Sequence, residues 1–568
     1  MYGSTSRDQW STTAASSSSS VDEDKTRSRM DGNKEENVME SKPSVNEKNG
    51  LENGAHDSHT VKQESLTAPL VFATCSAVLG SSLQFGYNTG VINNPKPIIQ
   101  SFFNETEYRR TGSFMPDDRN EFLFATTVAI FAVGGMIGSL TAGSMADRFG
   151  RKGSLLMNNV LAVLAALLMG FSQLASSYEM LIIGRIIVGI NCGINTGIVP
   201  MYLSESSPFN LRGAISVMNQ LGVTVGILLS QVLGLPVLLG TDDLWPLCLG
   251  AAIIPAIIQL VTMPFCPESP RYLLINKNKQ KEAEKALVWL RRHSDIQDEI
   301  AEMRREHAEE QKEERVSVWQ LFKRSSLRRP LLISIVMQLS QQLSGINAVL
   351  YYSSLIFVAA GITQENAMYA TLSTGGVMVL MTIVSVPLMD RSGRRALHLF
   401  GLGFMAVWAS LLTIFLVVGE NWDPASYISI VCVMFFTVGF AIGPGSIPWL
   451  IVAELFSQGP RPAAISIAFC VNWTANFAVG LLFPILQNSL TDYVFIIFIV
   501  LLVIFFIFTF FFVPETKNKS FEEISALFKS KNSLENGKEG GSSDSDSSPV
   551  NSKMDQGVQY SALKSDMT

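Results

Sequence analysis

Four amide side chains lie close together in the stretch QLSQQLSGIN, which begins at Gln338 and has apolar residues on both sides. An amide donates and accepts hydrogen bonds without net charge, so grouped amides suit a neutral ligand that carries hydroxyl groups. At helical spacing Gln338, Gln341 and Gln342 share one face, and Gly345 follows where the helix could break. We therefore interpret Gln341, Gln342 and Asn347 as candidate ligand-binding residues.

The alternative is that these amides only join neighbouring membrane helices. Polar side chains do so at about 0.6–2 kcal/mol each. That interpretation would suit an isolated glutamine, whereas three glutamines and an asparagine within ten residues favour a binding site.

The elements that must position these amides are about twelve apolar runs between Pro69 and Val513. Each run has roughly the 20 residues needed to span a bilayer as a helix. The expected fold is therefore an all-α membrane protein. Residues 1–66 and the segment from about residue 529 onward are polar and are predicted to be disordered tails. A formal net charge of -6 does not suggest nucleic acid as a partner, and no secretory signal precedes the first run.

Basic residues between the runs predict the orientation. Alternate loops are basic and contain the residues Arg148, Arg151, Lys152, Arg212, Arg391, Arg394, Arg395 and Arg461. Because positive loops stay inside, we expect both tails in the cytoplasm and a multi-pass protein of the plasma membrane. The outer loop 94–121 is an exception, since it contains four basic residues and also the sequon NET. Asn104 in this sequon is the predicted glycosylation site.

Three sequence pairs recur in the same order at nearly constant separation. They are DRFGRK at Asp147 with DRSGRR at Asp390, Glu205 with Glu454, and PESPR at Pro267 with PETK at Pro514. An arginine, Arg212 or Arg461, follows each glutamate by seven residues. The pattern predicts a duplicated six-helix unit, residues 67–265 and 330–513, with a cytoplasmic helical linker at 266–329 and a C-terminal tail at 514–568. Such architecture is typical of transporters, in which the ligand binds between the halves.

The repeated charges also suggest a gate on the inner side. We expect charge pairs between the two halves when that side is closed, which must break when it opens. The residues of this predicted cytoplasmic gate are Arg151, Glu205, Arg212, Arg394, Arg395, Glu454 and Arg461.

The repeated loops, QLSQQLSGIN, GPGSIPW at Gly443 and VAELFSQGPRP at Val452 together resemble the sugar porters of the major facilitator superfamily. Among these, the chain is most similar to the animal facilitative glucose transporters, from about residue 68 to 528. The resemblance implies sugar binding at Gln220, Gln341, Gln342, Asn347 and Trp449 with Asn472 nearby, and an outer gate at Tyr351 and Tyr352.

The resemblance also bears on specificity. The stretch Gln338, Leu339 and Ser340 resembles glucose-preferring members. Two positions depart from the family pattern: Met378 stands where many relatives have a sugar-binding asparagine, and Ala441 stands where relatives carry a glutamate. Both departures remove polar partners for a sugar.

Passive transport is favoured by Asn88, which stands where proton-coupled relatives have an aspartate. An amide does not titrate, and the sequence shows no other carboxylate at mid-membrane depth and no ATP-binding motif. We expect a hexose uniporter, with no enzyme activity, cofactor, metal or obligate protein partner. The alternatives are a proton-coupled sugar or polyol symporter and a transporter-like nutrient sensor that signals through its tails.

Overall fold

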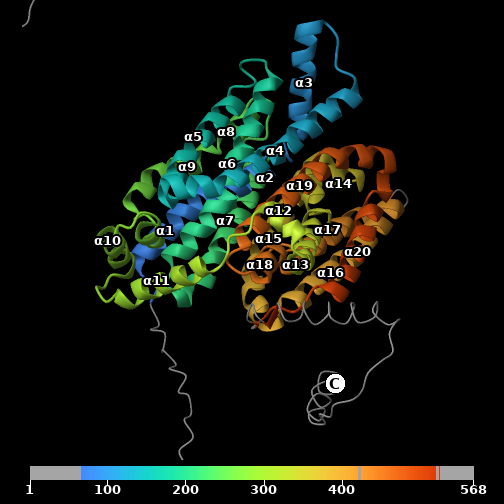
Figure 1. Cartoon of the computed structure of the whole chain (residues 1–568). Coiled ribbons are helices and arrows are strands. Elements are labelled where there is room, and N and C mark those ends of the chain that lie inside the picture. Colours follow the sequence, from blue (N-terminus) through green and yellow to red (C-terminus); the bar gives the residue numbers. More distant parts are fainter. Residues whose placement is uncertain (1–64, 420–421, 423, 518, 520–522, 525–568) are drawn as a thin grey trace, which may run out of the picture. The chain divides into compact units, whose positions relative to one another are not determined.

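The computed structural model describes residues 65–419, 422, 424–517, 519 and 523–524. Within these residues the chain is helical and contains no strand. Twelve helical segments are long and apolar enough to cross a membrane, which confirms the predicted all-α membrane fold (Figure 1). The predicted tails lie mostly outside the described residues.

The N-terminal half contains six spanning segments. The first consists of α1 (Ala68–Ala77), a π-helical turn (Val78–Ser82) and α2 (Leu83–Gly90), which follow one another without a gap. The others are α4 (Asp117–Phe149), α5 (Arg151–Gly170), α6 (Tyr178–Ser206), α7 (Arg212–Leu233) after a short 3-10 turn (Phe209–Leu211), and α8 (Trp245–Gly250) with α9 (Ile253–Thr262) and a last 3-10 turn (Met263–Phe265).

The segment expected as an outer loop forms a further helix, α3 (Lys96–Thr111). It packs because Ile99 and Phe103 are fully buried on one of its faces. Ion pairs hold both ends, from Lys96 to Glu121 at 2.8 Å and from Arg110 to Glu179 at 2.5 Å. The predicted glycosylation site Asn104 lies on this helix and is half-buried.

The linker is helical and consists of a π turn (Tyr272–Asn276), α10 (Gln280–Arg291), α11 (Gln297–Lys312) and α12 (Val318–Lys323). Arg271, from the PESPR motif, fixes α11 through ion pairs of 2.5 Å to both Glu306 and Glu310. Burial lowers the pKa of the Arg271 guanidinium, but the two carboxylates outweigh this effect and the pKa is raised.

The C-terminal half contains six further spanning segments, two of which are broken. Its helices are α13 (Ser325–Gln342), α14 (Ile346–Ala359), α15 (Gln364–Ser392), α16 (Arg394–Gly419), α17 (Pro424–Ile442), α18 (Ile447–Leu455), α19 (Arg461–Leu490) with a short 3-10 turn (Thr491–Tyr493), and α20 (Phe495–Phe512). The breaks separate α13 from α14 and α17 from α18.

Small residues allow the helices of the N-terminal half to approach closely. A Cβ on Gly138 of α4 would lie 2.1 Å from the carbonyl oxygen of Ile190 on α6, and a Cβ on Gly193 would lie equally close to the carbonyl oxygen of Gly135. Such contacts are the usual way in which membrane helices pack without a hydrophobic driving force. The pair α4–α6 is therefore a tightly packed element.

Candidate substrate-binding site

The helix that carries the quoted amides breaks directly after them, as predicted. α13 ends at Gln342 and α14 begins at Ile346. Between them Gly345 has a φ of 97°, a left-handed conformation that other residues rarely adopt. A Cβ here would also lie 2.9 Å from the ring of Phe498. Both the backbone and the packing therefore require glycine, and the amides lie at a helix end.

The second break, in GPGSIPW, is bound to the first by one of these amides. The gap between α17 and α18 covers residues 443–446, which confirms the break expected there. The Nε2 atom of Gln341 donates to the carbonyl oxygens of Pro444 at 2.9 Å and Gly445 at 2.7 Å. A helix end leaves carbonyl groups without helical partners, so Gln341 satisfies groups that the break exposes.

Asn472 on α19 joins the amides of α13. Its Nδ2 atom donates to the Oε1 atoms of Gln338 at 2.8 Å and Gln341 at 2.7 Å, and its Oδ1 atom accepts from Gln342 at 2.9 Å. The Oε1 atom of Gln342 in turn accepts from Asn347 and, at 3.3 Å, from Asn476. We call Gln338, Gln341, Gln342, Asn347, Asn472 and Asn476 the amide cluster.

The amide cluster contains no charged group and each member is buried. Four of the six predicted sugar-binding residues belong to it. The other two lie apart from it: Gln220 is half-buried on α7 of the other half, and the ring of half-buried Trp449 lies 5.2 Å from the ring of Phe469. Gln220 makes no hydrogen bond to the residues that the structure describes, so its amide can take an external partner.

The three residues of the predicted specificity stretch face neighbouring helices. Ser340 donates to the carbonyl oxygen of Met337 at 2.7 Å and lies 3.1 Å from Nε2 of buried His398 on α16. Gln338 is fully buried, and Leu339 packs against the main apolar cluster. These residues can therefore influence a ligand through the position of Gln341 and Asn472. His398 was not anticipated from the sequence.

The two positions that depart from the family pattern differ in their surroundings. Met378 is 3% exposed and belongs to the apolar cluster, whereas Ala441 is half-buried next to the second helix break. Neither side chain offers a hydrogen bond at its position.

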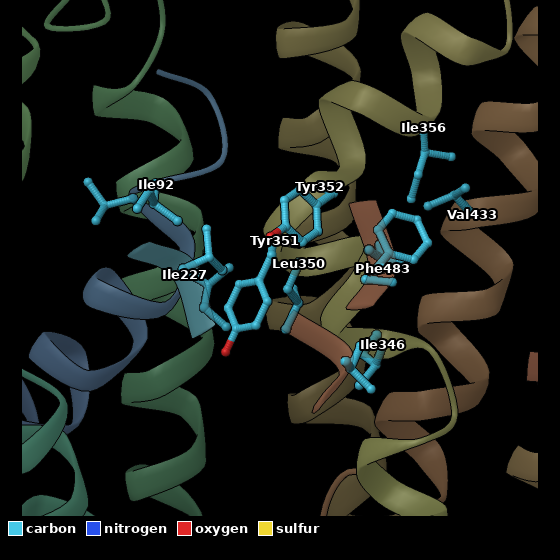
Figure 2. Close-up of a cluster of buried hydrophobic side chains, with 14 of the residues drawn as sticks. Ile92, Ile227, Ile346, Leu350, Tyr351, Tyr352, Ile356, Val433 and Phe483 are labelled. Atoms are coloured by element: carbon cyan, nitrogen blue, oxygen red, sulfur yellow. The ribbon is translucent and has the colours of Figure 1, made fainter. Parts of the chain in front are cut away.

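Two tyrosines close the site on the side opposite the basic loops. Tyr351 and Tyr352 are each 1% exposed, and Figure 2 shows them within the apolar cluster, near Ile227 and Ile92 of the other half. The Tyr351 hydroxyl donates to Oδ1 of Asn476 at 3.0 Å, which connects it to the amide cluster. The Tyr352 hydroxyl donates to the carbonyl oxygen of Gly480 at 2.8 Å.

Hydrogen bonds join the two halves on this same side. Asn93 donates to Ser353 at 2.6 Å and to the carbonyl oxygen of Leu350 at 3.1 Å. Ser354 donates to Asn94 at 3.1 Å. These residues follow α2 or lie on α14, far along the chain from the basic loops, so the halves are closed together opposite the basic-loop side.

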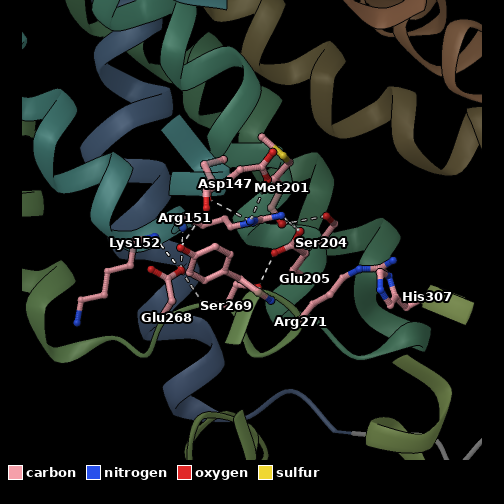
Figure 3. Close-up of polar contacts among 12 residues, drawn as sticks. Asp147, Arg151, Lys152, Met201, Ser204, Glu205, Glu268, Ser269, Arg271 and His307 are labelled. Atoms are coloured by element: carbon pink, nitrogen blue, oxygen red, sulfur yellow. Dashed lines mark hydrogen bonds and ion pairs between the residues drawn. The ribbon is translucent and has the colours of Figure 1, made fainter. Parts of the chain in front are cut away.

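The predicted gate charges of the N-terminal half form a cluster at the basic loop (Figure 3). An ion pair of 2.8 Å joins Arg151 to Glu205, and Ser269 donates to the same glutamate. The Glu268 carboxylate accepts the backbone N–H groups of Arg151 at 2.8 Å and Lys152 at 3.0 Å. The PESPR motif therefore clamps the GRK loop.

The C-terminal half repeats this arrangement atom for atom. Arg394 pairs with Glu454 at 3.1 Å, and Thr516 donates to Glu454. Glu515 of PETK accepts the backbone N–H groups of Arg394 at 2.9 Å and Arg395 at 3.1 Å. The repeated glutamates thus serve the same purpose in both halves.

These ion pairs lie within each half, whereas we expected pairs between the halves. The carboxylates take their partners from the nearest loop of their own half. Of the remaining predicted gate residues, Arg461 donates to the carbonyl oxygen of Phe456 at 3.0 Å, and Arg212 lies 5.8 Å from the Phe209 ring. Pairing between the halves stays a prediction for a state whose basic-loop side is closed.

Arg185 on α6 is a buried charge that the sequence interpretation missed. It is fully buried, and Nη1 donates to the carbonyl oxygen of Asn88 at 2.9 Å while the guanidinium lies 4.7 Å from the Phe131 ring. No carboxylate of the described residues forms an ion pair with it. Its sequence signal was a single arginine inside the apolar run MLIIGRIIVG.

Comparisons with known proteins agree with this geometry. The family model "Sugar (and other) transporter" matches residues 73–528. The facilitated glucose transporter member 3 of solute carrier family 2 from Gallus gallus is 53% identical over 466 residues, covering 82% of this chain and 93% of the relative. The same transporter from Canis lupus familiaris is 50% identical over 465 residues, with equal coverage of both chains.

Solved structures show the same fold. The xylose transporter XylE from E. coli, in a partially occluded inward open conformation, matches with a TM-score of 0.68 at 26% identity, covering 80% of this chain and 100% of that chain. The proton:xylose symporter XylE bound to 6-bromo-6-deoxy-D-glucose matches with a TM-score of 0.65 at 25% identity, covering 82% of this chain and 100% of that chain.

Proposed function

The chain belongs to the sugar transporter family of the major facilitator superfamily, and we propose that it carries hexoses, glucose in particular, passively across the membrane. It is a transporter rather than an enzyme. The observation that carries the proposal is the uncharged amide cluster at the two helix breaks, together with an asparagine where a titrating group would be needed for proton coupling.

The amide cluster supports sugar binding by exchange of partners. Its amides hydrogen-bond one another, and a typical hydrogen bond contributes about 1 kcal/mol net. A sugar hydroxyl can therefore replace an amide partner at little cost, since both groups donate and accept. We propose that Gln341, Gln342, Asn347 and Asn472 bind the sugar from the C-terminal half, with Gln220 and Trp449 completing the site.

The surroundings of Asn88 support passive transport. Arg185 lies against the backbone carbonyl of residue 88, so a carboxylate at this position would face a buried positive charge and could exchange a proton against it. The amide of Asn88 instead donates to the carbonyl oxygen of Gln84 at 2.9 Å and cannot take up a proton. Arg185 then keeps its charge throughout the cycle.

Alternating access requires at least two states of similar free energy. The contacts between the halves at Tyr351, Tyr352 and Asn93 support a state that is closed outside and faces inward. We propose that the basic-loop side is cytoplasmic, that both termini lie in the cytoplasm, and that the protein resides in the plasma membrane. Glycosylation at Asn104 fits this orientation, although Thr106 of the sequon is buried, so modification would precede folding.

Labelled-glucose counterflow in proteoliposomes tests the substrate. We expect unlabelled glucose to drive uptake of label at equal pH, with galactose, mannose and fructose competing less well. Failure of every hexose to compete would refute sugar transport. Uptake that requires an inward proton gradient would favour the symporter alternative, which the structural likeness to XylE keeps open as a specific outcome.

A further inference from the structure

The linker ends in a short helix with an unusual surface. α12 (Val318–Lys323) lies directly before α13, the first spanning helix of the C-terminal half. Leu321 is fully buried in a cluster with Phe456 and Leu455, which fixes α12 against the end of the helical bundle. The position of α12 relative to the spanning helices is therefore set by packing.

The opposite face of α12 is apolar and exposed. Trp319 is 78% exposed, Phe322 46% and Val318 45%. A tryptophan this exposed loses the burial of a large apolar ring, and tryptophans at the ends of spanning helices commonly lie at the membrane–water interface. Because only one residue separates α12 from the spanning segment that begins at Ser325, this face lies close to the membrane surface.

The charge of the linker changes sign at α12. Residues 297–314 contain eight acidic and three basic residues, whereas residues 315–329 contain five basic and no acidic residues. The nearest carboxylates are engaged elsewhere: Glu313 accepts the backbone N–H of Gly459 at 2.7 Å, and Glu314 pairs with Arg324 at 2.8 Å. Lys323 at the end of α12 is exposed.

Arg328 folds back toward α12 and keeps a positive charge beside the aromatic face. Its Nε atom donates to the carbonyl oxygen of Phe322 at 2.8 Å. The combination of exposed aromatic rings with a basic cluster next to a spanning helix is suited to anionic headgroups at the cytoplasmic leaflet. A purely aqueous surface would not explain the exposed tryptophan, and a purely hydrophobic partner would not explain the charges.

We propose that Val318, Trp319, Phe322, Lys323 and Arg328, the α12 surface, bind the headgroups of anionic phospholipids on the basic-loop side of the membrane. Trp319 and Phe322 enter the interface between headgroups and acyl chains, and the cations contact the lipid phosphates. The inference uses the orientation proposed above but does not depend on which sugar is carried.

Lipid selectivity tests the electrostatic part. The full chain is reconstituted in phosphatidylcholine vesicles that carry traces of spin-labelled phosphatidylserine or phosphatidylcholine, and the motionally restricted fraction of each label is measured. We expect selectivity for phosphatidylserine, and Lys323→Glu should lower its relative association constant by about fivefold. The control Lys285→Glu changes an exposed lysine of α10 in the same linker and should have no effect. Equal selectivity in both variants would overturn the proposal.

Tryptophan fluorescence tests the aromatic part. The difference between wild type and Trp319→Phe isolates the emission of Trp319, which lipids brominated near the headgroup should quench. Quenching by aqueous iodide instead would show that the ring faces water, and protection from both quenchers would show that a protein segment covers it. Either result would overturn the proposal.

A free anion is distinguished by adding inorganic phosphate or sodium chloride at matched ionic strength. Screening predicts an equal loss of phosphatidylserine selectivity with both salts. A loss specific to phosphate would show that the α12 surface binds a soluble anion and would contradict binding of lipid.

Discussion

The two halves share their cytoplasmic ends but differ at mid-membrane. The first spanning segment of the N-terminal half runs from α1 to α2 without a gap, and the fourth, α6, is continuous from Tyr178 to Ser206. The corresponding segments of the C-terminal half break before Ile346 and before Ile447. Duplication therefore produced one half with continuous helices and one half with two helix ends at the proposed site.

This difference assigns different tasks to the halves. The N-terminal half packs α4 against α6 through glycine contacts and buries the uncompensated charge of Arg185. The C-terminal half supplies five of the amides around its breaks, and Gln341 ties one break to the other. We infer that the C-terminal half binds the sugar and changes shape locally, while the N-terminal half provides a stiff opposing wall.

Removing the amide that joins the two breaks should have the largest effect. Gln341→Ala deletes the partners of the Pro444 and Gly445 carbonyl groups and of Asn472, and unsatisfied buried groups cost about 1–3 kcal/mol each. We expect glucose affinity in transport assays to fall by roughly 5- to 150-fold. Gln220→Ala in the N-terminal half should cost less, because that amide has no partner among the described residues.

The pair also separates binding from structural support. If Gln341→Ala lowered thermal stability but left competition by glucose unchanged, the amide cluster would only join helices. Equal losses of affinity in both variants would remove the proposed asymmetry between the halves.

The helix break itself can be tested by adding one methyl group. Gly345→Ala must adopt a positive φ and approach Phe498, so we expect a loss of stability of about 1–3 kcal/mol and strongly reduced transport. Gly376→Ala on α15 is the matched control, since a Cβ there meets nothing within 4 Å. Thermal melting in detergent and initial uptake rates measure both. Similar effects at the two glycines would contradict a special conformation at the break.

The two cytoplasmic clusters should respond alike because their contacts are alike. Glu205→Gln and Glu454→Gln each remove an ion pair with an arginine and weaken the clamp on the adjacent loop. We expect both variants to favour inward-open forms and to slow transport by a few-fold, since a few kcal/mol determine such populations. Accessibility labelling of introduced cysteines reports the populations. Unchanged labelling would reduce these residues to topology or local structure.

The smallest effect is expected at the position that departs from the family pattern. Met378→Asn places an amide in an apolar cluster of the C-terminal half. We expect transport within a few-fold of wild type and slightly stronger competition by glucose, since a second hydrogen-bonding group becomes available near the amide cluster. Competition by glucose, galactose, mannose and fructose measures the change, and a loss of uptake would show that packing at this position matters more.

Local sequence rules predicted the parts of the fold that depend on local chemistry. The lengths of the apolar runs indicated the twelve spans, and Gly345 and the GPG motif marked both breaks because few other residues tolerate those conformations. The repeated glutamates were correctly recognised as equivalent. Clustering of Gln341, Gln342 and Asn347 followed from their spacing on one helix end.

The remaining features depend on contacts distant in sequence. The ion pairs within each half could not be told from pairs between halves, because both use the same residues. Asn472 reaches α13 from a helix more than a hundred residues away, and Arg185 gains meaning only from its position behind Asn88. The outer helix α3 was expected as a loop because its charges concealed the buried face of Ile99 and Phe103.

The most direct test of the account measures the steady-state ratio of internal to external glucose under an inward proton gradient. The account predicts a ratio of one for the wild type, because Asn88 cannot exchange a proton with its surroundings near Arg185. Gln341→Ala should reach the same ratio more slowly. Accumulation of glucose above the external concentration in the wild type, abolished by collapse of the gradient, would contradict passive transport.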